Sequence, residues 1–234
     1  MNFLEAGQRS ALNPDSTWGV LVKCRVIAVL GTRPEAIKLA LVIHELRRRS
    51  DQFETAVVHT GQHRTMLDHV LRLFQIRPDF DLDVMRANQT LTSLTCRVLD
   101  TVENACHRFQ PNMVLVQGDT TTAFASALAA YYNKIPVGHI EAGLRSWDMY
   151  NPFPEEANRR LVSVTAEIHF APTVLARDNL LREGVPNEKI VVTGNTVIDT
   201  LAGAERDAAF LGKHSAREHF HRRLPAAARH FASP

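Results

Sequence analysis

Short runs of β-branched and other apolar residues alternate along the chain with longer stretches that show helical spacing. Runs of this kind that end in polar or turn residues are typical of strands. They predict six β-strands, at residues 25–30, 55–59, 113–116, 136–140, 168–171 and 189–193. Helical spacing follows the first two of them, at Leu39, Val42, Ile43 and Leu46 and at Leu67, Val70, Leu71 and Phe74. Because strands that alternate with helices form parallel sheets, we predict an α/β fold: a doubly wound, Rossmann-like parallel sheet of six strands and five crossovers.

The same pattern divides the chain into three segments. Residues 23–203 contain every predicted strand and form the predicted domain. Residues 1–22 contain glycine and proline without periodicity, which predicts an unstructured leader or a start codon placed too early. Residues 204–234 are rich in Ala, Arg and His and have no strand-like run, which is typical of a helix or a linker.

The predicted topology indicates where a ligand would bind. In an open α/β sheet the ligand crevice lies beyond the carboxyl ends of the strands. The loops at that edge are GTRPEAIK (31–38), TGQHR (60–64), QGDTTT (117–122), the long segment 141–160 and TGNTVID (193–199).

The first of these loops has the features of an anion site. It opens a predicted helix with Pro34 near the first position and Glu35 in the first turn. Thr32, Arg33 and the free helix N–H groups are therefore expected to face the crevice. The alternative is a capped helix with a solvated arginine. The loop matches neither the dinucleotide fingerprint GxGxxG nor a Walker loop.

Three acidic residues follow neighbouring predicted strands: Asp119, Glu141 and Glu155. Like charges held together in a partly dry cleft raise one another's pKa, which suits carboxylates that transfer protons near neutral pH. For Asp119 alone, a helix cap is the simpler interpretation. For the set, the structural alternative is ion pairs with nearby arginines, namely Arg145, Arg159 and Arg160.

Composition narrows the class of protein. The chain of 234 residues is 45% hydrophobic and 22% charged, as in an ordinary globular protein, and its net charge of +2 gives no reason to expect a nucleic-acid partner. No apolar stretch is long enough for a membrane span and no signal peptide is present, so we expect a cytoplasmic protein. Cys24, Cys96 and Cys106 fit neither disulfides nor a metal site and are interpreted as buried, reduced thiols.

Residues 31–199 resemble the bacterial non-hydrolysing UDP-N-acetylglucosamine 2-epimerases motif by motif. The matching motifs, in order, are GTRPEAIK, GQHR-x-MLD, PDFDLDVM, VQGDTTT, IPVGHIEAGLR, NPFPEEANRR, HFAPT and TGNTVIDTL. Any one of them alone is a weak signal, whereas their order along one chain is a strong one.

The resemblance implies that the protein interconverts UDP-GlcNAc and UDP-ManNAc. UDP is eliminated to give a 2-acetamidoglucal and is then added back, with the proton delivered to the opposite face of C2. This route needs no cofactor and no metal. At the matching motif positions, Asp119, Glu141 and Glu155 are assigned to proton transfer, and Arg33 and Lys38 to substrate and diphosphate contacts.

The resemblance also covers residues whose role it leaves open. His63 is expected either to bind substrate or to cap a helix. Gln62 and Gln89 match residues that contact a second, regulatory UDP-GlcNAc in some members of the family. Asn88 and Thr65 replace the Arg and Gln that are common in those members, which argues against such regulation here.

The resemblance also implies a second Rossmann-like lobe, which completes a two-lobed GT-B architecture and holds most of the uridine diphosphate. We therefore expect a truncated chain that is inactive or weakly active by itself, with residues 204–234 as the linker to the missing lobe. The string His221, Arg222 and Arg223 follows no apolar strand, so it is not interpreted as the family's His-Arg-Arg loop. A homodimer is expected from the family. Two alternative functions remain, a non-catalytic module that binds nucleotide sugars and a hydrolysing relative that releases ManNAc and UDP.

Overall fold

The computed structural model describes residues 23–61, 64–84, 86 and 88–200. The predicted leader and the predicted linker lie outside the described residues. The strands are β1 Cys24–Leu30, β2 Phe53–His59, β3 Phe80–Asp81, β4 Met113–Gln117, β5 Val137–Ile140, β6 Ile168–Ala171 and β7 Ile190–Val192. The helices are α1 Arg33–Arg48, α2 Arg64–Leu73, α3 Leu91–Phe109, α4 Thr121–Tyr132, α5 Glu155–Thr165 and α6 Val174–Arg182, with a 3₁₀ turn at Asn187–Lys189 and a helical turn that begins at residue 196.

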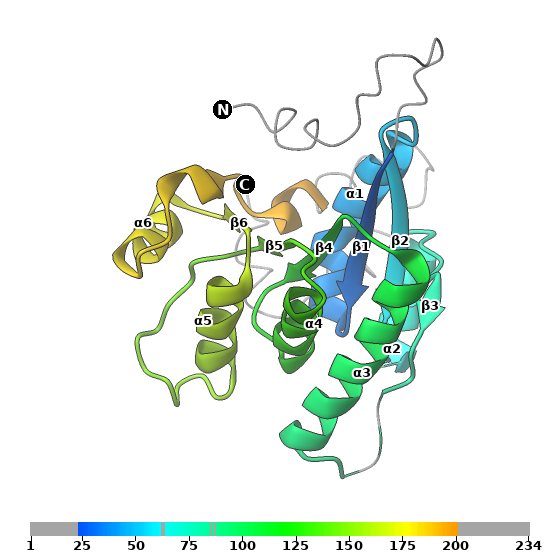
Figure 1. Ribbon diagram of the computed structural model, residues 1–234, viewed down its shortest axis with the longest axis horizontal. Helices are drawn as coiled ribbons and strands as arrows, with labels where there is room; N and C mark the ends of the chain where they lie inside the picture. The colour runs from blue at the N-terminus through cyan, green and yellow to red at the C-terminus, as the bar shows by residue number, and fades with distance from the viewer. Residues whose placement is uncertain (1–22, 62–63, 85, 87, 201–234) are drawn as a thin grey trace, which may run out of the picture.

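The seven strands form one parallel sheet in the order β3-β2-β1-β4-β5-β6-β7. The chain winds from β1 to one edge and then returns past β1 to the other edge, which is the doubly wound, Rossmann-like arrangement (Figure 1). The predicted fold class is therefore confirmed. All six predicted strands are present, with ends that differ by at most two residues.

The prediction of only six strands was wrong, because β3 was missed. β3 has two residues, Phe80 and Asp81, which pair with Val58 and His59 at the edge of the sheet. An edge strand of two residues leaves no hydrophobic run in the sequence, so its periodicity is not detectable.

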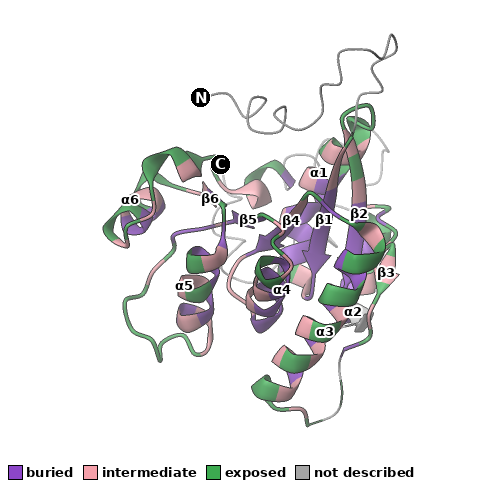
Figure 2. Cartoon of the chain, viewed as in Figure 1, coloured by how far each residue is buried: buried purple, intermediate pink, exposed green. Residues whose placement is uncertain are grey.

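The sheet is the middle of three layers, and β1 shows how the sequence builds them. Val26, Ala28 and Leu30 pack against α1 and α2, whereas Ile27 and Val29 pack into a second core with α3, α4 and α5. Because successive side chains of a strand point to opposite faces, an unbroken apolar strand supplies both cores. Figure 2 shows the result, with buried residues along the central strands and exposed residues on the outer helix faces.

The three cysteines are free, but the prediction that all are buried was wrong. Cys106 is buried and Cys24 is half-buried, whereas Cys96 is exposed on α3. That helix turns Leu94 and Val98 inward. Cys96 lies two residues from each, which places it on the opposite side of the helix. Within the described ranges, no helix combines the length and apolar character of a bilayer-spanning segment.

Two histidines are buried side by side in the sheet. His139 of β5 pairs in register with His169 of β6, and both are almost fully shielded from solvent. Burial, the main cause, lowers the pKa of His139 to about 3 and that of His169 to about 4. His139 Nε2 lies 2.8 Å from the carbonyl oxygen of Gly118, which fixes the ring next to the loop that follows β4.

Candidate active site

Glu35 forms hydrogen bonds with two of the loops at the carboxyl edge of the sheet. Its buried carboxylate accepts hydrogen bonds from the backbone N–H groups of Gly31 (2.6 Å) and Thr32 (2.7 Å) and from the hydroxyl of Thr120 (2.5 Å). Burial raises the pKa of Glu35, and these hydrogen bonds oppose the rise. From the sequence, only its place in the first turn of the helix was predicted. The capping-box pattern that joins Thr32 to Glu35 was the signal for this role.

The loop after β4 shows which residue caps α4. The side chain of Thr120 accepts a hydrogen bond from the backbone N–H of Ala123 at 3.0 Å and is the N-cap. Asp119, the residue before it, therefore does not cap the helix, and the simpler interpretation of its carboxylate was wrong. Its side chain is free to face the crevice, where it is 30% exposed.

The Asp119 carboxylate has one cation and two anions around it. Arg159 of α5 donates from Nη2 to Oδ2 of Asp119 at 2.5 Å. Burial raises the pKa of Asp119, Arg159 lowers it, and the negative charges of Glu141 and Glu155 raise it further. The three carboxylates predicted to cluster at one edge of the sheet therefore lie close enough for two of them to raise the pKa of the third.

Glu141 is held by three side chains from three different segments. Lys38 of α1 and Gln117 of β4 each donate to Oε2 at 2.5 Å, and Asn195 donates to Oε1 at 3.2 Å. The residue follows β5 and has a φ of 65°, a left-handed conformation that is uncommon outside glycine. The donors surround a side chain that is only 13% exposed. Gln117 and Asn195 were not predicted as site residues, because neither residue type is distinctive in the sequence until the fold brings it to Glu141.

Glu155 is the first residue of α5 and is partly exposed. Among the described residues, no side chain forms an ion pair or a hydrogen bond with its carboxylate. It is the least constrained of the three acidic groups. Its position at a helix N-terminus is favourable for a negative charge.

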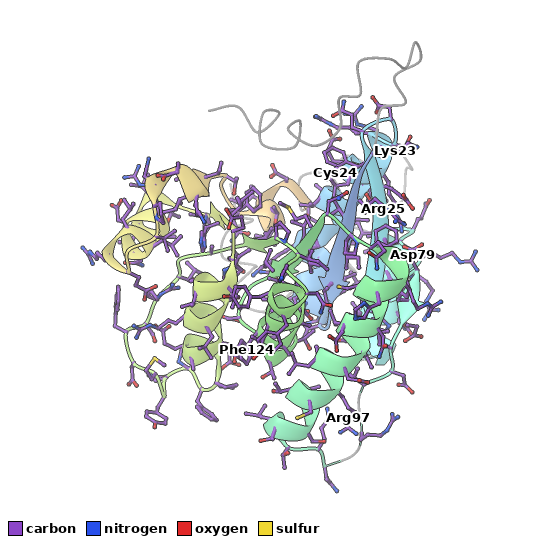
Figure 3. All side chains as sticks on the ribbon, viewed as in Figure 1. Lys23, Cys24, Arg25, Asp79, Arg97 and Phe124 are labelled. Atoms are coloured by element: carbon purple, nitrogen blue, oxygen red, sulfur yellow. The ribbon has the colours of Figure 1, made fainter. Side chains whose placement is uncertain are left out.

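The predicted binding residues differ in their exposure and in their contacts. Arg33, the first residue of α1, is partly exposed and has no ion-pair partner within the part of the chain that the structure describes. Lys38 forms an ion pair with Glu141 and is partly buried. Gln89 precedes α3 and accepts a hydrogen bond at 2.7 Å from Arg97, which projects from that helix (Figure 3). His63 and Gln62 lie outside the described residues.

The three arginines near the carboxylates divide into two groups. Arg159 pairs with Asp119, as the structural alternative proposed. Arg145 and Arg160 instead pair with Glu183 at the end of α6, at 2.6 Å and 3.2 Å. Their charges therefore hold α5, α6 and the preceding loop together and do not neutralise the crevice.

An open groove of about 900 Å³ lies between α5 and α6, but it is not the candidate site. Its walls include Trp147, Arg160, Val164, His169 and Lys189 and none of the three clustered carboxylates. Among the described residues, no three His, Cys, Asp or Glu side chains are grouped so as to hold a metal ion. The chemistry available at the carboxyl edge is thus that of acid and base groups beside cationic side chains.

Comparison with known proteins identifies similar chains. The family model described as UDP-N-acetylglucosamine 2-epimerase matches residues 44–230. The UDP-N-acetylglucosamine 2-epimerase of Yersinia pestis is 56% identical over 177 residues, which are 76% of this chain and 47% of that protein. The chain therefore spans about half the length of the curated relatives it matches.

Solved structures agree with this result. The crystal structure of UDP-GlcNAc 2-epimerase from Neisseria meningitidis bound to UDP-GlcNAc has a TM-score of 0.78 and 49% identity, covering 85% of this chain and 52% of that one. The Methanocaldococcus jannaschii UDP-GlcNAc 2-epimerase in complex with UDP-GlcNAc and UDP has a TM-score of 0.76 and 35% identity, covering 85% and 53%. The resemblance seen in the motifs is confirmed: the chain belongs to the UDP-N-acetylglucosamine 2-epimerase family.

Proposed function

We propose that the carboxyl edge of this sheet is the acid–base half of an enzyme that converts UDP-GlcNAc to UDP-ManNAc. The observation that carries the proposal is that Asp119, in the loop after β4, lies close enough to Glu141 and Glu155 to feel their charges. Glu141 follows β5 and Glu155 begins α5, and the chain is 56% identical over 177 residues to an epimerase. The relatives solved with UDP-GlcNAc and with UDP support the choice of substrate.

The chemical problem is the proton on C2, which no neighbouring carbonyl makes acidic. In the proposed route a carboxylate takes this proton while the bond from C1 to the phosphate oxygen breaks, and the electron pair of that bond leaves with UDP. The neutral 2-acetamidoglucal then accepts a proton on the opposite face of C2, and UDP adds back to C1. The route needs acid–base groups on both faces of the sugar and cations that hold the detached diphosphate.

The three carboxylates are suited to different parts of this task. Asp119 has a raised pKa and so takes and releases a proton more readily near neutral pH than an ordinary carboxyl. Glu141 is fixed by three donors, which favours a group that must keep one orientation toward the sugar. Glu155 has no such partners among the described side chains and is free to reorient.

Diphosphate binding is proposed for the first loop. Arg33 stands at the start of α1, and its guanidinium has no ion-pair partner among the described residues. The N–H groups of Gly31 and Thr32 are taken up by Glu35, so the arginine side chain is the proposed diphosphate contact in this loop. Lys38 lies one turn further on and contacts Glu141. A lysine between a phosphate and a carboxylate would bring the leaving group and the acid–base residue to the same side of the sugar.

The test is incubation with UDP-GlcNAc in D₂O, with C2 observed by NMR. It should be run on this chain and on a fusion to the part of the Yersinia pestis relative that the chain does not match. We expect little or no turnover by the chain alone, and deuterium at C2 together with UDP-ManNAc from the fusion. An Asp119→Asn fusion is expected to lose most of this activity, and full activity in that variant would remove Asp119 from the proposal.

The products separate the alternative functions. Free ManNAc and UDP, without UDP-ManNAc, would indicate a hydrolysing enzyme. Binding of UDP-GlcNAc without exchange at C2, in the fusion as well, would indicate a non-catalytic module. The homodimer, the cytoplasmic location and the regulatory role of Gln62 and Gln89 stay predictions.

A further inference from the structure

Glu156 is a fully buried carboxylate that organises the loop in front of it. Oε2 accepts a hydrogen bond from the backbone N–H of Ser146 at 2.9 Å, and Oε1 accepts one from Trp147 at 3.2 Å. Arg159, one turn further along α5, places Nη1 3.3 Å from Oε2. A carboxylate with no solvent contact is stable only when donors of this kind surround it. Glu156 therefore depends on both the loop and the arginine.

Arg159 has a second partner on its other arm. While Nη1 faces Glu156, Nη2 donates to Oδ2 of Asp119 at 2.5 Å, and the side chain is only 13% exposed. The guanidinium is planar and rigid, so its two arms are not free to move independently. A continuous series of contacts thus runs from Asp119 through two side chains to the backbone of Ser146 and Trp147.

The loop at the end of this series is strained and carries exposed aromatic side chains. Trp147 has a φ of 65°, which costs a non-glycine residue about 1 kcal/mol or more unless other contacts offset it. Its N–H bond to Glu156 is such a contact. Further along, the rings of Tyr150 and Phe153 stack with centroids 6.2 Å apart, and Glu155 follows two residues later.

We propose that Arg159 and Glu156 are positioning residues that couple Asp119 to the loop of residues 142–154, so that the charge on Asp119 and the order of the loop depend on each other. In this arrangement one buried pair sets both the orientation of a proton-transfer group and the path of the chain that leads into Glu155. The inference rests on the proposed function only for the role given to Asp119.

The coupling is measured by amide hydrogen exchange in the 234-residue chain, without substrate. Asp119→Asn replaces a charge-assisted bond to Arg159 by a weaker neutral one. We expect the amides of Ser146 and Trp147 to exchange about three- to tenfold faster, which lies in the lower part of the range of coupling between residues in contact. In an Arg159→Met background, Asp119→Asn should have no further effect. Arg159→Lys, which keeps the charge but has one nitrogen instead of two arms, should also lose the coupling.

Glu141→Gln is the matched control. It removes a negative charge from the same crevice, but the contacts of Glu141 are with Lys38, Gln117 and Asn195. Exchange at Ser146 and Trp147 should then stay as in the unsubstituted chain, and core amides of β4 should stay protected in every variant.

Two results would overturn the proposal. One is unchanged loop exchange in Asp119→Asn, and the other is equal acceleration with and without Arg159. Because no turnover is measured, an inactive fusion would count against the proposed function and leave this coupling untouched.

Discussion

The pKa of Asp119 depends on burial, on one neighbouring cation and on two neighbouring anions. Removal of the cation should raise its pKa further, because Arg159 is the largest influence that lowers it. For Arg159→Met we expect the pKa of Asp119 to rise, because an opposite charge within contact distance is lost. A ¹³C NMR titration of the side-chain carboxyl measures this. Arg160→Met is the control, since Arg160 pairs with Glu183. If the pKa of Asp119 rose equally in both variants, the direct contact with Arg159 would not be what lowers it.

His139 links the stability of the fold to pH. Its pKa is lowered to about 3, mainly by burial, so the folded state keeps the ring neutral where the unfolded chain, with an ordinary pKa near 6.5, binds a proton. The stabilisation is complete above about pH 6.5 and is lost as the pH falls toward 3.

For His139→Gln we therefore expect a loss of stability at pH 7 that shrinks by about 2 kcal/mol at pH 5, at roughly 1.4 kcal/mol per pH unit. Glutamine retains a donor for the carbonyl of Gly118 and does not titrate. Urea unfolding of both chains at the two pH values measures the difference. If the difference in unfolding free energy between the two chains did not change with pH, His139 would titrate in the same way in the folded and unfolded states.

At the scale of elements, the loop after β5 packs closely against α6. Gly143 has a φ of 88°, and a Cβ added there would lie 2.2 Å from the carbonyl oxygen of Ala176 in the first turn of α6. Asn179 of the same helix donates to the carbonyl of Gly143 at 3.0 Å. The loop that carries Glu141 is thus fixed by contacts with α6.

Gly143→Ala should cost about 3 kcal/mol or more, because the methyl group displaces α6 in addition to straining the backbone. Gly184→Ala is the matched control. Its φ of 85° is nearly the same, but no atom lies within 4 Å of the added Cβ, so it should cost only about 1 kcal/mol. Both free energies are measured by denaturant unfolding, and equal losses would show that space around Gly143 is not limiting.

The elements were largely predictable from the sequence, and the contacts between loops were not. Strands such as β1 and β4 are buried on both faces, so their apolar runs identify them directly. The crevice position of Asp119 and Glu141 followed from the rule that ligands bind at the carboxyl ends of strands. The partner of each acid depends on which loops meet in space. Arg159 rather than Arg145 contacts Asp119 because Arg145 turns to Glu183 on α6, a contact 38 residues away along the chain.

At the scale of the whole molecule, a chain about half as long as its relatives contains all three carboxylates of the proposed site. Both faces of the sheet are covered by a hydrophobic core, and within this one lobe Asp119 lies close enough to Glu141 and Glu155 to feel their charges. Catalysis by elimination needs more than proton transfer, because UDP must be retained while it is detached. Binding of substrate is therefore the property of the isolated chain that can be tested apart from turnover.

A ligand that binds only the folded chain raises its unfolding temperature, and the stabilisation grows with the logarithm of the ligand concentration above Kd. We expect millimolar UDP-GlcNAc to stabilise the chain by about 1 kcal/mol, which corresponds to roughly 2–4 °C for a protein of this size. Arg33→Met should remove this rise, because it removes the cation at the start of α1, which has no ion-pair partner among the described residues. Arg182→Met, which removes an exposed cation from the end of α6, should keep it. A rise that survives Arg33→Met would place the diphosphate elsewhere on the lobe, and no rise in the unsubstituted chain would mean that this lobe alone does not hold the nucleotide sugar.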